Sequence, residues 1–122
     1  LKKDHEGAYE KMGLCFGALG KYDNALEFLD KAYSIKPDSA SICVNYAKAY
    51  GAKGMRDKEV EMLNKAIKND PKYSDAYYNL GLSYKAQGKK KDAGDAFKKY
   101  LELYPDAPKK DMIQSLIEQM AE

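Results

Sequence analysis

The sequence repeats with a period of 34 residues, and this period limits the possible fold more than any other feature. The recurring positions are a glycine, a proline, a small residue and several large apolar or aromatic residues. They are Gly20, Gly54 and Gly88; Pro37, Pro71 and Pro105; Gly13, Ala47 and Gly81; Phe16, Tyr50 and Tyr84; and Leu29, Leu63 and Phe97. A unit this short cannot bury its apolar face alone, so the three copies are expected to stack into one continuous core.

Each unit contains two stretches in which apolar residues recur every three or four positions, the spacing of one helix face. In the first unit these stripes are Tyr9, Met12, Gly13 and Phe16, and then Tyr22, Leu26, Leu29, Ala32 and Tyr33. The glycine is expected to make the turn between two helices, and the proline to end the second helix. Asp23, Asp57 and Ser74 are expected to cap free amides where helices begin.

The third unit resembles the tetratricopeptide repeat family most closely. Its matching residues are Tyr77, Leu80, Gly81, Tyr84, Gly88, Ala93, Phe97 and Pro105. The resemblance implies an all-α fold, a right-handed superhelical stack of three helix-turn-helix repeats at about 6–39, 40–73 and 74–107. A capping helix is expected at about 108–121, and the whole chain, residues 1–122, is then a single domain.

Two residues depart from the family pattern. Glu59 stands where alanine lets helices touch, and we expect a partly exposed carboxylate paired with a nearby lysine, since an unpaired buried charge is costly. Tyr100 also replaces an alanine, one that would normally face a following repeat. Its presence fits a unit that ends the array.

The two ends of the stack are expected to differ. At the C-terminal end, Met112, Ile113, Leu116, Ile117 and Met120 form one apolar stripe, with Pro108 in the first turn of its helix. This stripe is expected to cap the stack, because its polar face is mixed in sign and does not favour a membrane surface. At the N-terminal end, Ala8, Cys15 and Leu19 should face a preceding helix, so that face is expected to continue into further repeats or to self-associate.

The composition disfavours several classes of function. No apolar run reaches the length of about 18 residues that a membrane span requires, so no membrane insertion is expected. The 21 basic and 19 acidic residues leave a formal charge of +2, which does not predict a nucleic-acid partner. The only histidine, His5, cannot build a metal site, and Cys15 and Cys43 occupy packing positions. We therefore expect no enzyme activity, cofactor or metal, and the cytoplasm is favoured over other compartments.

The run Lys89, Lys90 and Lys91 is expected to lie at a solvated helix turn, with binding of an acidic partner or phosphate as the alternative. Functional surfaces should instead lie where the first helices of the repeats line a concave groove. The residues expected to bind a peptide there are Lys11, Leu14, Val44, Asn45, Lys48, Tyr78, Asn79, Leu82 and Lys85. Asn45 and Asn79 stand one repeat apart, and each amide can match the donor and acceptor of an extended peptide backbone.

Co-chaperone members of this family hold a peptide C-terminal carboxylate with a clamp of lysines, asparagines and a further basic residue. At the matching positions this chain has Glu10, Leu14, Asn45, Asp75 and Asn79. Two acidic residues in place of lysines would repel a carboxylate, so this mode of recognition is disfavoured. The sequence predicts a protein-interaction module, scaffold or adaptor that binds a peptide segment of a partner in its groove. The alternative is a scaffold that oligomerises end to end through its open N-terminal face.

Overall fold

The computed structural model describes residues 5–122, and residues 1–4 lie outside the described part of the chain. Within it the chain folds into seven helices: α1 (His5–Ala18), α2 (Tyr22–Ile35), α3 (Ala40–Ala52), α4 (Arg56–Asn69), α5 (Ser74–Ala86), α6 (Lys90–Leu103) and α7 (Lys110–Met120). Residues 5–122 contain no strand, which confirms the all-α prediction. None of these helices combines the length and the apolar character that crossing a bilayer would take.

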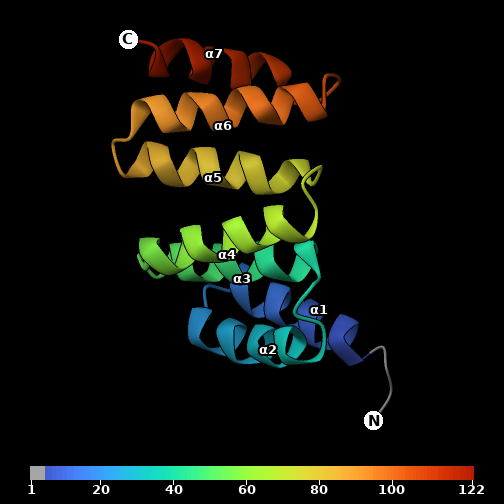
Figure 1. Cartoon of the computed structure of the whole chain (residues 1–122). Coiled ribbons are helices and arrows are strands. Elements are labelled where there is room, and N and C mark those ends of the chain that lie inside the picture. Colours follow the sequence, from blue (N-terminus) through green and yellow to red (C-terminus); the bar gives the residue numbers. More distant parts are fainter. Residues whose placement is uncertain (1–4) are drawn as a thin grey trace.

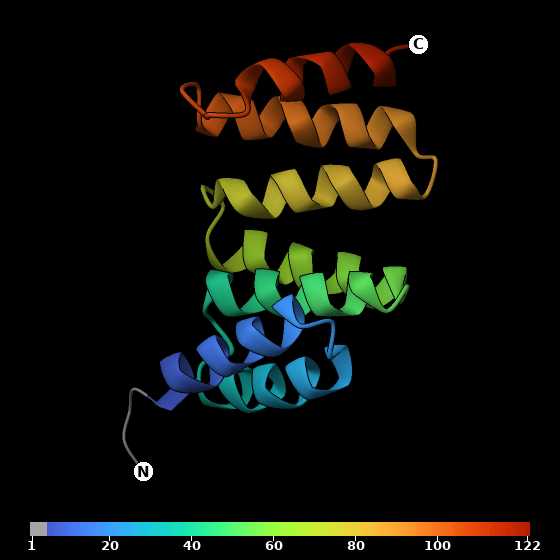
Figure 2. The same ribbon diagram turned by 180° about the vertical axis from the view of Figure 1, so that it is seen from behind.

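The helix pairs are piled in chain order, with α1 and α2 at one end of the stack and α7 at the other (Figures 1 and 2). Consecutive helices pack as the pairs α1 with α2, α3 with α4, and α5 with α6, and α7 packs on α6. The first helices of the pairs also contact one another, α1 with α3 and α3 with α5. These three helices therefore form one continuous layer, which we call the inner layer.

The glycine of each unit makes the turn between paired helices. Gly20, Gly54 and Gly88 have φ angles of 77°, 78° and 77°, a left-handed conformation that glycine adopts without steric cost. Each turn is closed in the same way, as the amide of Lys21 donates to the carbonyl of Phe16 at 2.9 Å, and equivalent 2.9 Å bonds close the other two turns. The turns are thus repeated in conformation as well as in sequence.

Close contact between paired helices depends on the small residue at the middle of the first helix. A Cβ atom on Gly13 would lie 2.6 Å from Cγ of Leu29, and one on Gly81 would lie 2.5 Å from the ring of Phe97. Leu29, Leu63 and Phe97 are fully buried, as expected for side chains that fill the space opposite the small residue. The small residues at positions 13 and 81 thus let the paired helices approach closely.

The predicted N-terminal caps are wrong, because Asp23, Asp57 and Ser74 already lie inside the helices that they were expected to precede. The cap positions of α2, α4 and α5 are Lys21, Met55 and Tyr73, and none makes a side-chain capping bond. The closed glycine turns fix where α2 and α4 begin, which places the predicted aspartates inside the first turn. Ser39, which the sequence analysis did not single out, caps α3 by accepting a hydrogen bond from the amide of Ile42 at 3.2 Å.

The C-terminal helix α7 covers the last repeat as expected, but it begins later than the predicted start near residue 108. Its first residue is Lys110, so Pro108 lies before the helix and not in its first turn. Ile113 is fully buried, and Leu116, Ile117 and Met120 pack against the same cluster. Met112 is exposed and does not belong to the packing stripe.

The structure corrects the prediction for Glu59, which is only 8% exposed. Its carboxylate is paired with Arg56 at 2.9 Å and not with a lysine. It also accepts a hydrogen bond from the buried hydroxyl of Ser83, on α5, at 2.7 Å. The departure from alanine therefore creates a polar link between the second and third repeats, and burial is tolerated because the carboxylate has two partners.

Candidate peptide-binding groove

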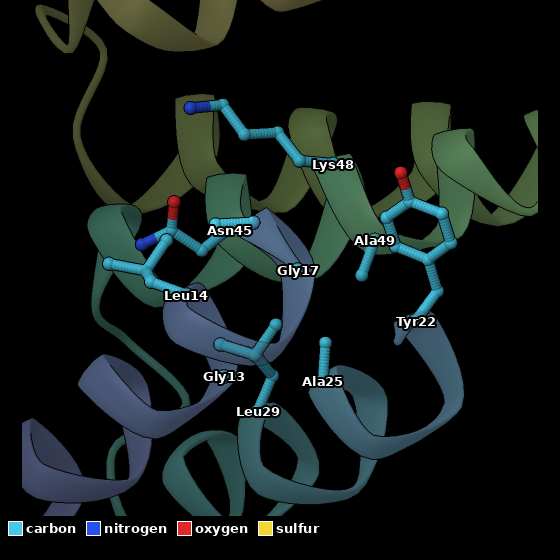
Figure 3. A pocket seen from close by; sticks show the side chains of 10 residues that line it. Gly13, Leu14, Gly17, Tyr22, Ala25, Leu29, Asn45, Lys48 and Ala49 are labelled. Atoms are coloured by element: carbon cyan, nitrogen blue, oxygen red, sulfur yellow. The ribbon is translucent and has the colours of Figure 1, made fainter. Parts of the chain in front are cut away.

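Two neighbouring cavities open along the inner layer, and Lys48 of α3 lies between them because it lines both. The first, which we call the apolar cavity, has a volume of about 230 Å³ (Figure 3). It is lined by Gly13, Leu14, Gly17, Ala18, Tyr22, Ala25, Leu29, Asn45, Lys48 and Ala49. The second, which we call the tyrosine cavity, has a volume of about 350 Å³ and is lined by Lys48, Asp75, Tyr78, Asn79, Tyr100, Tyr104, Pro108 and Lys109.

The apolar cavity exists because two facing positions of the first repeat are small. A Cβ atom on Gly17 of α1 would meet no other atom within 4 Å, and the position across from it on α2 is Ala25. In the second repeat the same two positions are Gly51 and Glu59, and there the carboxylate fills the space, 2.2 Å from where a Gly51 Cβ would lie. The same frame thus gives an open cavity in one repeat and a filled one in the next.

The polar rim of the apolar cavity is preorganised by a contact between the first two repeats. The carboxylate of Glu10 on α1 accepts hydrogen bonds from Asn45 Nδ2 at 2.7 Å and from the hydroxyl of Ser41 at 2.5 Å. The Asn45 amide group that was expected to meet a peptide backbone therefore already has a partner. Its carbonyl oxygen remains the acceptor that this residue can offer to a ligand.

The tyrosine cavity is walled by three aromatic rings from α5, α6 and the segment that follows α6. The Tyr78 and Tyr100 ring centroids are 5.4 Å apart with planes inclined at 46°, and those of Tyr100 and Tyr104 are 6.0 Å apart at 70°. Burial raises the pKa of the Tyr100 hydroxyl, and the nearby Asp75 carboxylate raises it further. The Tyr100 hydroxyl thus stays protonated and neutral at physiological pH.

Two residues of opposite charge, Lys109 and Asp75, also line the tyrosine cavity. Lys109 places its ammonium group 5.2 Å from the centroid of the Tyr78 ring. Asp75 comes from the first turn of α5 and carries a negative charge at the same cavity. Asn79 donates its amide to the backbone carbonyl of Asp75 at 2.8 Å, so it is tied to its own helix.

The structure brings together five of the residues that the sequence analysis placed in the groove. Leu14, Asn45 and Lys48 line the apolar cavity, and Lys48, Tyr78 and Asn79 line the tyrosine cavity. Lys11, Leu82 and Lys85 are exposed but line neither cavity.

Val44 is a correction to the predicted site. It is 2% exposed and belongs to the main hydrophobic cluster, so its side chain is not available to a ligand. The reason is that Val44 lies on the side of α3 that packs within the core, one residue before the groove position of Asn45.

Part of each cavity comes from outside the inner layer and was not predicted from the sequence. Tyr22, Ala25 and Leu29 reach the apolar cavity from α2, and Tyr100 and Tyr104 reach the tyrosine cavity from α6 and its end. One signal in the sequence could have pointed to the residues of the tyrosine cavity that come from α6, since Tyr100 stands where the family pattern has alanine. The contribution of Lys109 depends on the path of the chain between α6 and α7, which no periodic pattern specifies.

Outside the groove, the N-terminal face of α1 is uncovered. Met12 is 43% exposed, whereas the residues at its position in the next two repeats, Tyr46 and Leu80, are 8% and 7% exposed. Ala8, Cys15 and Leu19 on the same face are exposed too. Within residues 5–122 no three histidine, cysteine, aspartate or glutamate side chains gather in a way that could hold a metal ion.

Comparison with known proteins agrees with this architecture. Sequence models of the tetratricopeptide repeat match residues 6–39, 40–73 and 74–107. A comparison with curated proteins finds no match. Among solved structures, the Sgt2 TPR domain from Aspergillus fumigatus is 28% identical, with a TM-score of 0.87 over 96% of this chain and 77% of that one.

Two further solved structures are similar. The first TPR domain of human RPAP3 is 21% identical, with a TM-score of 0.89 over 98% of this chain and 92% of that one. The second TPR of Spaghetti (RPAP3), bound to the HSP90 peptide SRMEEVD, is 26% identical, with a TM-score of 0.77 over 83% of this chain and 94% of that one. With the family models covering most of the sequence, the chain belongs to the tetratricopeptide repeat family, and its fold is that family's α-α superhelix.

Proposed function

We propose that this protein is a scaffold or adaptor that binds a peptide segment of a partner protein along its inner layer. Tetratricopeptide repeat domains are protein-interaction modules, and similar domains bind HSP90 and HSP70 peptides. The observation that carries the proposal is the apolar cavity, an open hollow lined from α1, α2 and α3 beside polar groups of Asn45 and Lys48. Such a combination of apolar lining and a few fixed polar groups is typical of ligand sites.

The apolar cavity is suited to one large apolar side chain of the peptide. A dry cavity of about 150 Å³ already admits a benzene-sized group, so about 230 Å³ provides sufficient room. Leu29 and Ala25 are buried beneath it and supply apolar contact, while Leu14 is exposed at the rim. The Asn45 oxygen and the Lys48 ammonium then lie close enough to the entrance to contact the peptide backbone on either side of the anchor.

The charges of the groove favour a peptide unlike SRMEEVD, which ends in acidic residues. Glu10 and Asp75 stand at positions where co-chaperone repeats carry lysines, and Glu10 already binds Ser41 and Asn45. An acidic peptide tail would meet two negative charges there, and like charges in a desolvated contact cost several kcal/mol. We therefore propose recognition of an internal or basic segment.

Filling the apolar cavity is expected to weaken peptide binding without harming the fold. In Gly17→Leu the new side chain enters open space and occupies the anchor position. Peptides selected on the wild-type protein from a random-peptide phage library should bind this variant at least about tenfold more weakly, a loss of about 1.4 kcal/mol. Fluorescence anisotropy of labelled peptides gives the affinity, and circular dichroism checks the helix content.

Gly7→Leu is the matched control, because Gly7 lies on the same helix, also faces open space and does not line the cavity. It should bind the selected peptides as the wild type does. If Gly17→Leu retained wild-type affinity for all of them, the apolar cavity would not be the anchor site.

A second candidate function is end-to-end self-association through the N-terminal face of α1. The observation that favours it is the exposure of Met12, whose counterparts Tyr46 and Leu80 are buried. A copy that covered this face would bury apolar surface worth about 25 cal/mol per Å².

Sedimentation velocity over a range of concentrations tests this second function. If it is correct, the wild-type protein should grow in size with concentration, and Met12→Lys should remain a monomer because a buried unpaired ammonium is costly. Met55→Lys is the control, since Met55 is equally exposed at the turn before α4. A wild-type protein that remains monomeric throughout would rule out the second function.

A further inference from the structure

We propose that the tyrosine cavity binds a lysine or arginine side chain of the partner peptide, in the place that Lys109 occupies in the free protein. This inference rests on the proposed peptide-binding function and specifies the chemistry of its ligand. The cavity lies next to the apolar cavity, and Lys48 lines both, so one extended peptide can contact the two.

The aromatic walls favour a cation. The faces of aromatic rings carry partial negative charge, and a cation within about 6 Å of a ring centroid is attracted to it. Tyr78, Tyr100 and Tyr104 all line the cavity, and neighbouring rings are inclined at 46° and 70°, so they do not stack flat. Inclined rings present several faces to one ligand, the arrangement by which aromatic pockets hold ammonium groups.

The chain itself shows that the cavity accepts a cation. The Lys109 ammonium lies 5.2 Å from the Tyr78 centroid and, among the described residues, forms no ion pair. Lys109 is exposed and lies on the short connection before α7, where it caps no backbone amide with its side chain. It can therefore leave the ring when a ligand cation with more contacts replaces it.

Asp75 supplies the negative charge that a cation needs. Its carboxylate lines the same cavity and also forms no ion pair within residues 5–122. The Asn79 amide nitrogen is committed to the Asp75 backbone carbonyl, so the Asn79 side-chain oxygen is left as an acceptor for a lysine or arginine donor. Lys48 stands at the rim shared with the apolar cavity, where its long stem lets its ammonium group remain in solvent.

The opposite interpretation is that Lys48 and Lys109 together bind an acidic side chain. The two interpretations predict opposite effects for the loss of Lys109. If the cavity binds a basic side chain, loss of the competing Lys109 cation should strengthen that binding. If Lys109 instead helps to bind an acidic side chain, its loss should weaken the binding of the acidic peptide. This difference in sign makes the proposal testable without knowledge of the partner.

The test uses three blocked tripeptides: acetyl-Gly-Arg-Gly-amide, its citrulline analogue and acetyl-Gly-Glu-Gly-amide. The citrulline side chain has the shape of arginine without its charge. Each is titrated into the full chain carrying ¹³C-labelled tyrosine, and the ring resonances of Tyr78 and Tyr104 are followed by NMR. The arginine peptide should shift these resonances with a dissociation constant at least about threefold below that of the citrulline peptide, as expected for an exposed cation–π contact. The glutamate peptide should shift them least.

Three variants complete the test. Lys109→Ala should tighten the arginine peptide by at least about twofold, Asp75→Asn should weaken it, and Lys85→Ala, an exposed lysine outside the cavity, should leave it unchanged. Tighter binding of the glutamate peptide, weaker arginine binding by Lys109→Ala, or no shift with any peptide would each overturn the proposal. The peptide-binding function is separately decided by Gly17→Leu, so phage-selected peptides that need the apolar cavity but ignore arginine would contradict only this inference.

Discussion

Replacing Phe97 by alanine is expected to lower the free energy of unfolding by about 3–5 kcal/mol, more than any other single truncation proposed here. The ring is fully buried, and it fills the space that Gly81 leaves open on the facing helix. It also contacts Tyr78, at a centroid distance of 6.3 Å. Because helix backbones on both sides hold the cavity open, the structure can collapse only partly around the missing ring. Urea unfolding followed by circular dichroism measures the loss.

Phe28→Ala is the matched control for this prediction. Phe28 is half-buried and stacks on Phe16 at 5.4 Å near the open N-terminal end, so part of its surface is already in water. Its truncation should cost about 1–2 kcal/mol. Equal losses for the two variants would show that burial in the third repeat does not determine stability.

The second large effect concerns the space between Gly51 and Glu59. Gly51→Ala should destabilise the protein by about 1–3 kcal/mol, because the new methyl group would occupy the position of the Glu59 carboxylate. Displacing that carboxylate also disrupts its hydrogen bond from Ser83 and its ion pair with Arg56. A substitution that normally stabilises a helix is therefore expected to weaken this one.

A double-mutant cycle isolates the cause. In a Glu59→Ala background the carboxylate is absent and only the flexible Arg56 side chain lies nearby, so Gly51→Ala should stabilise the helix by about 0.5–1 kcal/mol, the usual advantage of alanine over glycine. The sign of the Gly51→Ala effect should thus reverse between the two backgrounds, as measured by urea unfolding. An identical cost in both would mean that the carboxylate is not the obstacle.

The same pair of positions connects stability to the candidate site. In the first repeat, Gly17 and Ala25 leave a cavity, whereas in the second Gly51 and Glu59 do not. The open space at these two positions is therefore a property of the first repeat and not of the family frame. The Glu59 side chain is compatible with the fold because Arg56 and Ser83 satisfy its carboxylate.

The parts of the fold that the sequence predicted are those set by local periodicity. The helix pairs, the glycine turns and the buried positions of Leu29, Leu63 and Phe97 all follow from a 34-residue frame read against helix geometry. The helix starts were predicted less well. Asp23 and Asp57 lie inside the first turn because the backbone bonds that close each glycine turn determine where the next helix begins.

The site was predicted only in part, for a physical reason that particular residues show. Leu14, Asn45 and Lys48 face the groove as their positions indicate, but Val44 is buried because adjacent helix residues point about 100° apart and the core lies on its side of α3. The engagement of Asn45 by Glu10 joins two repeats, and no pattern within one repeat contains that contact.

By itself the sequence determined that this chain forms three stacked helix pairs with a capped C-terminal end, because repeated spacing fixes which faces must be buried. Only the tertiary structure decided where that stack remains open. The apolar cavity and the tyrosine cavity arise from side chains on different helices, such as Gly17 with Ala25 and Tyr78 with Lys109. Their shapes depend on the distances between packed helices and on the path of the connection before α7, and those quantities are set by the packing of the whole stack.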